Sequence, residues 1–170
     1  MDIAEQLERA LTLDGAGEID AALVCLEAID GQIPDQAAHL ILVGQLYQRL
    51  GADAPSLRHL LRALELKPDD ADLHMSLGYH YVDNGDPAAA LNYFQRHLQL
   101  EPTSLEGQVF AGRTLDFLGR LSEAEAALRG AQAMAPKDID ILHQLGRVLL
   151  RQKNINAAEA VFGEATRQQA

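Results

Sequence analysis

Apolar residues recur at helical spacing in the middle of the chain. In residues 68–102, Leu77 and Tyr81 share one helical face, and Ala90 and Phe94 share another further along. A spacing of three to four residues is typical of an amphipathic α-helix with one buried face. The pattern therefore predicts two short helices in this stretch.

A turn signal separates the two predicted helices. Asn84 and Gly85 end the first helix, since glycine readily adopts the left-handed conformation found there. Asp86 and Pro87 start the second, because aspartate caps free amides and proline suits the first helical turn. Together the helices and the turn predict a helical hairpin.

The hairpin pattern repeats every 34 residues along the whole chain. Prolines stand 34 residues apart at Pro34, Pro68, Pro102 and Pro136. Glycine recurs in the predicted first helices at Gly44, Gly78, Gly112 and Gly146, and in the turns at Gly17, Gly51, Gly85 and Gly119. Second helices carry a small residue at Ala22, Ser56, Ala90, Ala124 and Ala158, and a large one at Leu26, Leu60, Phe94, Leu128 and Phe162.

This pattern resembles the tetratricopeptide (TPR) repeat, whose period is 34 residues. The signature tryptophan is absent, since the chain contains none. The resemblance implies an all-α, right-handed α-solenoid of five hairpins, about ten helices, in one domain over residues 1–170. The expected repeats span residues 3–36, 37–70, 71–104, 105–138 and 139–170.

Charge and composition narrow the class of protein. The net charge is −11, and residues 1–36 hold nine acidic residues against Arg9 alone. Such a chain is a poor candidate for binding nucleic acid or anionic membranes, which favour basic surfaces. The acidic end is interpreted as a solvated cap, with attraction to the more basic residues 139–170 as the alternative. There is no run of 18 apolar residues and no signal-peptide pattern, so a cytoplasmic protein without membrane insertion is expected.

No catalytic motif stands out in the sequence. There is no phosphate-binding GxxxxGK[ST] loop, no GxSxG and no HExxH, and the six histidines lack metal-ligand spacing. The single Cys25 cannot form an intramolecular disulfide. His97 occupies a register of alanines and is expected to lean out of the helix seam. We therefore expect no enzyme activity, no cofactor and no metal.

The first and last repeats depart from the pattern at several positions, and one helix has a recognisable start. Asp30 and Gln32 replace usual leucines, which is typical of an end repeat facing solvent. Thr166 and Gln168 stand in the last repeat where two of the interior repeats place leucines, and they suggest a natural chain end. Thr103 and Glu106 have the spacing of a capping box. An apolar edge at residues 161–162 is the reason to retain a homo-oligomer as an alternative.

The first helices of TPR hairpins line a concave groove, where a partner is expected to bind. The residues predicted to face it are Ile41, Leu42, Gln45, Met75, Ser76, Tyr79, Val109, Phe110, Arg113, His143 and Arg147. Met75, Tyr79 and Phe110 are interpreted as a ligand-facing floor, the alternative being packing between adjacent first helices. Arg113 and Arg147 share a register and suit a carboxylate, the alternative being solvated side chains.

The function predicted from these features is a protein–protein interaction scaffold or adaptor. Its partner would be a protein or peptide whose apolar residues lie over the groove and whose acidic group meets the two arginines. Two alternatives remain: a TPR protein that assembles end to end with copies of itself, and a regulatory TPR segment of a larger enzyme. TPR folds serve many unrelated systems, so the fold alone does not name the partner.

Overall fold

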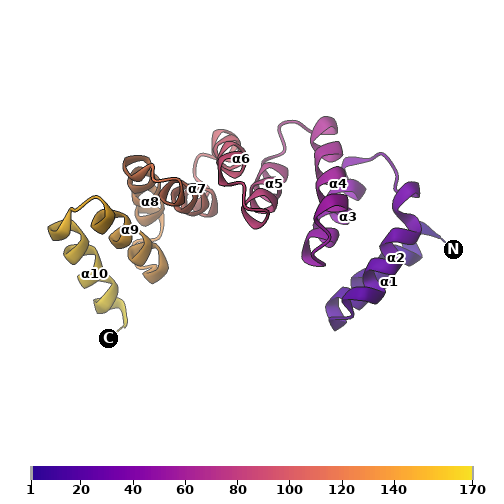
Figure 1. Cartoon of the computed structure of the whole chain (residues 1–170), viewed down its shortest axis with the longest axis horizontal. Coiled ribbons are helices and arrows are strands. Elements are labelled where there is room, and N and C mark those ends of the chain that lie inside the picture. The colour runs from indigo at the N-terminus through magenta and orange to yellow at the C-terminus, as the bar shows by residue number, and fades with distance from the viewer. Residues whose placement is uncertain (1, 170) are drawn as a thin grey trace. The chain divides into compact units, whose positions relative to one another are not determined.

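The computed structural model describes residues 2–169, which form ten α-helices and one short 3₁₀-helix, with no strand in that range (Figure 1). The elements are α1 (Ile3–Ala16), α2 (Ile19–Ile29), η1 (Asp30–Gln32), α3 (Ala37–Arg49), α4 (Asp53–Leu66), α5 (Ala71–Asp83), α6 (Pro87–Leu100), α7 (Leu105–Phe117), α8 (Leu121–Met134), α9 (Ile139–Arg151) and α10 (Ile155–Gln169). The predicted fold class, an all-α solenoid of about ten helices, is confirmed.

The turns between paired helices use the residues that the sequence predicted. Gly85 has φ 74°, in the left-handed region. The Asp86 carboxylate then accepts a hydrogen bond of 2.9 Å from the Ala89 amide, with Pro87 at the first helical position. The other turn glycines with positive φ are Gly17, Gly51 and Gly119. In the fifth copy Lys153 takes this place with φ 63°, a conformation that costs a side-chain-bearing residue more than glycine.

The small-and-large registers pack the two helices of a hairpin closely together. A Cβ added at Gly44 in α3 would lie 2.8 Å from Leu60 Cγ in α4. One added at Gly112 in α7 would lie 2.8 Å from Leu128 Cγ in α8. Leu60 and Leu128 are fully buried. At these two positions the absence of a side chain therefore allows the close approach of the partner helix.

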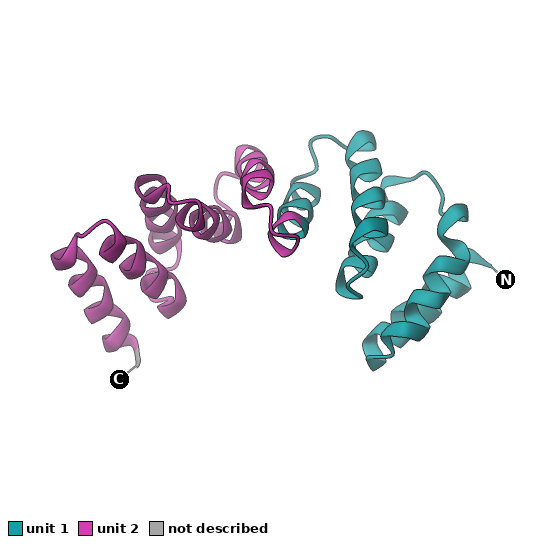
Figure 2. Cartoon of the chain, viewed as in Figure 1, with its two compact units in different colours: residues 1–80 teal, residues 81–170 magenta. Residues whose placement is uncertain are grey.

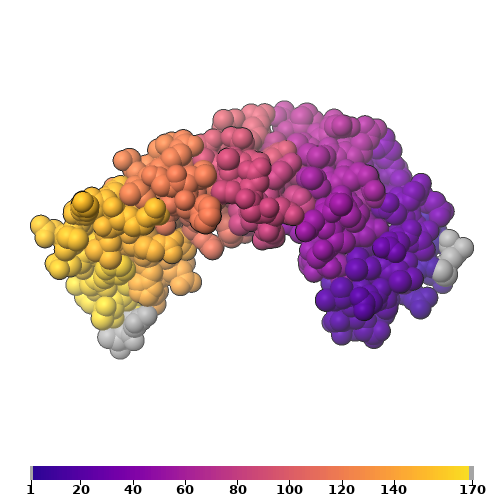
Figure 3. All heavy atoms as spheres, viewed as in Figure 1, coloured from indigo at the N-terminus to yellow at the C-terminus, as the bar shows by residue number. Residues whose placement is uncertain are grey.

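The chain divides into two compact units, residues 1–80 and 81–170, with the division inside α5 (Figure 2). In unit 1, buried residues of α1, α2 and α3 form one core cluster that includes Leu26 and Tyr47. In unit 2, α6 packs on α7, and α8 packs on α9. Helices α9 and α10 pack against each other at the yellow end of the space-filling view, which shows no opening on this face (Figure 3). The single domain over residues 1–170 stays a prediction.

His97 was expected to lean out of the seam, and that prediction is wrong. Its side chain is buried in unit 2, with Nε2 2.7 Å from Ser104 Oγ. A Cβ at Gly107 would lie 2.7 Å from the His97 ring. The missing side chain at Gly107 therefore leaves room for a histidine at a position where other repeats have alanine. Ser104 is also the N-cap of α7 and accepts a hydrogen bond from the Gly107 amide, in place of the Thr103 predicted for this role.

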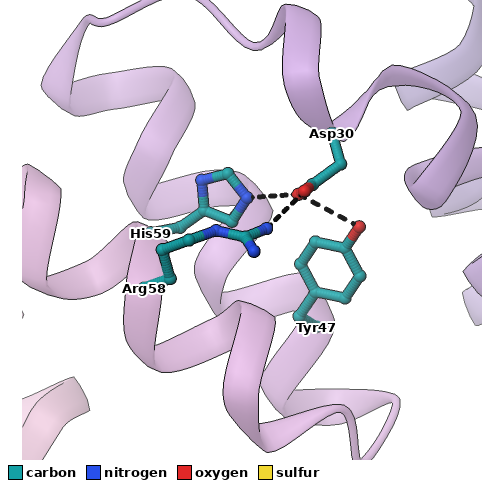
Figure 4. A network of polar contacts seen from close by, with 4 residues as sticks. All are labelled: Asp30, Tyr47, Arg58 and His59. Atoms are coloured by element: carbon teal, nitrogen blue, oxygen red, sulfur yellow. Dashed lines mark hydrogen bonds and ion pairs between the residues drawn. The ribbon is translucent and has the colours of Figure 1, made fainter.

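Asp30 was expected to face solvent as part of an end repeat, but it is the centre of a polar cluster in unit 1. One of its carboxylate oxygens lies 2.6 Å from His59 Nε2 and 3.3 Å from the Tyr47 hydroxyl, while Arg58 donates to the other (Figure 4). The Tyr47 and His59 rings stack with centroids 5.8 Å apart. Asp30 therefore joins the end of α2 to both helices of the next hairpin.

The polar partners in this cluster shift each other's ionisation. Burial raises the pKa of Asp30, but the hydrogen bond from His59 and the positive charge of Arg58 outweigh it, so the pKa lies below its ordinary value. For the Tyr47 phenol, burial, the negative charge of Asp30 and the hydrogen bond to it all raise the pKa. The cluster therefore favours an ionised Asp30 beside a neutral Tyr47.

Candidate functional site

A pocket of about 480 Å³ lies in unit 2, where the first helices approach their turns. Its lining comes from the end of α5, the turn after it, the start of α6, and from α7 and α9, two first helices that contact each other. The lining residues are Val82, Gly85, Pro87, Phe110, Arg113, Thr114, Asp116, Phe117, Arg147 and Arg151. Pockets of this size hold small ligands and side chains of peptides.

Helical periodicity explains why these side chains converge. On α7, Phe110, Arg113 and Phe117 are separated by three and four residues, which places them on one stripe. On α9, Arg147 and Arg151 are four residues apart and share a stripe in the same way. The pocket therefore combines an aromatic stripe with guanidinium groups from the neighbouring first helix.

Two of the three pocket arginines are held by a buried carboxylate. Arg147 Nη2 lies 2.9 Å from Asp116 Oδ2, and Arg151 donates both to Oδ1 and, at 2.5 Å, to the Asp116 carbonyl oxygen. The Asp116 side chain is only 6% exposed, whereas those of Arg147 and Arg151 are 59% and 45% exposed. A carboxylate this deeply buried needs such partners. The arginines keep further N–H donors at the pocket.

Arg113 stands in a different environment from these two. Its guanidinium carbon lies 5.1 Å from the centroid of the Phe110 ring, a cation–π geometry. The Phe110 ring in turn lies 5.7 Å from that of Phe94, which is fully buried. Arg113 is exposed, and among the residues that the structure describes it has no acidic partner. It is therefore the pocket cation whose charge is available to a ligand.

The structure places the residues predicted for the groove in several environments. Phe110, Arg113 and Arg147 line the pocket together. His143 is exposed on α9 with its ring 6.1 Å from that of Phe162, and Val109 is half-buried. These assignments as partner-binding residues stay predictions.

The remaining groove predictions fall in unit 1. Gln45 donates a hydrogen bond of 3.0 Å to Ser76 Oγ, while Met75 and Ser76 are only 6% and 8% exposed. Met75 thus has little surface to offer a ligand, in line with the packing alternative. Ile41, Leu42 and Tyr79 are half-buried.

The prediction missed the apolar part of the pocket wall. Val82, Pro87 and Phe117 line it, and Phe117 is 78% exposed, the highest value among the large exposed hydrophobic residues of the described chain. A signal was present in the sequence. Phe117 shares its 34-residue register with Gly15, Arg49, Asp83 and Arg151, and it is the one aromatic residue there.

Sequence profiles described as tetratricopeptide repeat match residues 54–104, 81–140 and 118–170. The chain belongs to the tetratricopeptide repeat family. Among curated proteins, this TPR chain is 30% identical over 102 residues to the BBSome complex member BBS4 homolog of Drosophila melanogaster, and 25% identical over 115 residues to anaphase-promoting complex subunit 3 of Schizosaccharomyces pombe. These matches cover 55% and 66% of the chain but only 21% and 17% of the relatives.

Solved structures of MamA share the fold. One superposes with a TM-score of 0.86 at 17% identity, covering 98% of this TPR chain and 91% of the other. MamA 41-end from Desulfovibrio magneticus RS-1 gives 0.86 at 17% identity, with 99% and 96% covered. At such identities the likeness concerns the fold alone.

Neither a membrane span nor a metal cluster occurs among residues 2–169. None of the helices in this range has both the length and the apolar character needed to cross a membrane. No group of three or more His, Cys, Asp or Glu residues in that part of the chain is arranged to hold a metal ion.

Proposed function

We propose that this TPR protein is an interaction scaffold or adaptor that binds an extended peptide of a partner protein at the pocket of unit 2. Apolar side chains of the peptide contact the aromatic stripe of α7, and an acidic group of the peptide meets Arg113, with Arg147 beside it. Preformed helices favour such binding, because little of the protein has to be ordered when the peptide docks.

The observation that carries this proposal is the composition of the pocket wall. Three arginines and one aspartate stand around exposed aromatic and aliphatic side chains, in a protein whose net charge is −11. Aromatic residues and arginine dominate binding energy at protein interfaces. Arginine also binds carboxylates through paired, charge-assisted hydrogen bonds, which gives the pocket a preference for acidic peptides.

Selection from a random-peptide phage library tests the proposal directly, since the enriched peptides themselves report which side chains the pocket prefers. The wild-type protein is expected to enrich peptides that combine an aromatic or large aliphatic residue with aspartate or glutamate. Arg113→Glu should abolish this enrichment, because the reversed charge repels the acid, while the exposed side chain leaves the fold intact.

Arg129→Glu provides a matched control, since Arg129 is exposed in the same unit but does not line the pocket. It produces the same change in net charge and should leave the enriched motif unchanged. Enrichment of basic peptides, or a motif that is equally sensitive to both substitutions, would contradict groove recognition at this pocket.

A further inference from the structure

Two junctions between successive hairpins share one arrangement of charges at the ends of their first helices. In unit 1, Asp14 at the end of α1 pairs with Arg49, 35 residues later at the end of α3, at 2.7 Å. In unit 2, Asp116 at the end of α7 pairs with Arg151, again 35 residues later, at the end of α9. The same two registers thus hold an acid–arginine pair between successive hairpins in both units.

Between these two pairs, the same registers hold Gln48 and Asp83 at one junction and an apolar pair at the next. Val82 occupies the position of Asp14 and Asp116, and Phe117, 35 residues later, occupies the position of Arg49 and Arg151. Both residues line the pocket, with exposed fractions of 41% and 78%. Exposed apolar side chains grouped in one patch are typical of binding sites. Core packing does not explain Phe117, since most of its surface faces solvent.

We propose that Val82 and Phe117 form the seat for one aromatic or large aliphatic side chain of the partner peptide, and that Arg113 binds a carboxylate on the residue next to it. This inference rests on the proposed function and specifies the chemistry of its ligand. Where the Asp14–Arg49 and Asp116–Arg151 junctions close this position with an ion pair, this one leaves it open and apolar. The partner's side chain completes the contact.

The charges around the seat favour an acidic side chain on the peptide residue next to the one that fills the seat. Arg147 and Arg151 are both paired with Asp116, whereas Arg113 lies three residues before Asp116 on α7 and four before Phe117. Phe117 and Arg113 therefore stand one helical turn apart on the same stripe. Adjacent residues of a peptide can reach both, so the apolar and the acidic side chain are expected to be sequence neighbours.

The chain itself supplies the substitution that tests the seat. Val82→Asp with Phe117→Arg introduces the acid–arginine pair found at Asp14–Arg49 and Asp116–Arg151, so the fold should be kept while the seat is closed. The probes are acetylated, amidated hexapeptides with glycine flanks around one central pair: phenylalanine–aspartate, phenylalanine–asparagine, alanine–aspartate or phenylalanine–lysine. Binding is measured by NMR titration of the ¹⁵N-labelled full chain, which detects weak affinities.

The wild-type protein should bind the phenylalanine–aspartate peptide with an affinity about tenfold above those of the other three, a difference of the size that one charge-assisted contact or one buried side chain provides. Shifts should centre on the pocket residues of α7. The double variant should lose this preference and keep its melting temperature. Phe117→Arg alone gives the same readout if the double variant does not fold. Val24→Asp, an exposed apolar position of α2 outside the pocket, serves as the control and should bind as the wild type does.

The outcomes separate this inference from the proposed function. If the four peptides bind alike, or none shifts the pocket resonances at about 5 mM, a concentration that reveals millimolar affinity, the seat is assigned wrongly. The same holds if the double variant keeps the preference. The proposed function fails separately, when the phage library gives no acidic motif that depends on Arg113.

Discussion

Two buried or half-buried aspartates organise the polar chemistry of the two units, and they do so with different consequences. Asp30 in unit 1 binds His59, Tyr47 and Arg58 within one cluster. Asp116 in unit 2 binds Arg147 and Arg151. Both carboxylates connect successive hairpins. The second also stands in the wall of a pocket that contains an exposed aromatic side chain.

The difference shows how one repeat supports both stability and recognition. Around Asp30, the aromatic groups are buried and stack on each other, so the cluster offers little to a ligand. Around Asp116, the arginines stay about half exposed beside Phe117. Unit 1 also carries 14 acidic and five basic residues, whereas unit 2 carries 11 and nine. Unit 2 is therefore the better binding site for an acidic peptide.

The largest expected effect is on the stability of unit 1. Asp30→Asn should lower the free energy of unfolding of unit 1 by about 1–3 kcal/mol, because His59 and Arg58 lose a charged acceptor. Hydrogen exchange of the α2 and α4 amides measures this locally. Asp35→Asn removes an exposed ion pair with Arg62 and serves as the control, with a smaller effect because solvent screens that pair. Equal effects would show that the Asp30 cluster contributes no more than a surface pair.

The next effect concerns affinity in unit 2. Arg113→Gln should weaken binding of a selected acidic peptide by about tenfold, the loss of one charge-assisted contact, without changing the melting temperature. Titration calorimetry and thermal denaturation measure the two quantities. Arg129→Gln is the matched control. An unchanged affinity for the peptide would remove Arg113 from the binding site.

Asp116→Asn should have a smaller effect on affinity, of about two- to fivefold, because Arg147 and Arg151 lose the carboxylate that orients them at the pocket. Bulk electrostatics alone predicts the opposite sign, since the substitution removes a negative charge beside an acidic ligand. Asp116→Glu should restore part of the loss. Tighter binding by Asp116→Asn would show that the carboxylate competes with the ligand instead of positioning the arginines.

The smallest effect is a pH dependence that distinguishes the Asp30 cluster. Because the pKa of Asp30 is lower in the folded protein than its ordinary value of 3.8, its stabilisation is complete at neutral pH. It declines as the pH falls below that value and through the folded-state pKa. The protection factors of the α2 amides, which correct for the pH dependence of intrinsic exchange, should therefore fall more between pH 5 and pH 3 in the wild type than in Asp30→Asn. Parallel profiles would contradict the assigned ionisation.

The helices and their turns could be predicted because their causes are local. Gly85, Asp86 and Pro87 end one helix and start the next through backbone geometry that neighbouring residues determine. The alternation of small and large residues likewise predicted which faces pack. The prediction for His97 was wrong because its burial depends on Gly107, in the next helix, which leaves room for the ring.

Part of the candidate site could be predicted in the same way. Phe110, Arg113 and Arg147 follow from counting along helices whose register the repeat establishes. Val82 and Phe117 were missed because they lie at the ends of their first helices, outside the positions predicted to face the groove. Asp30 was misinterpreted because its partners lie 17 to 29 residues away in the next hairpin.

The sequence by itself determined the period, the number of hairpins and the turns within them for this TPR protein, since all of these follow from local propensity and a 34-residue pattern. Only the tertiary structure decided which charges are paired and which remain available. Arg113 and Arg147 look alike in the sequence, yet one lies over an aromatic ring and the other is bound to a buried carboxylate. Ionic and aromatic contacts depend on distances between separate helices, which a one-dimensional register does not contain.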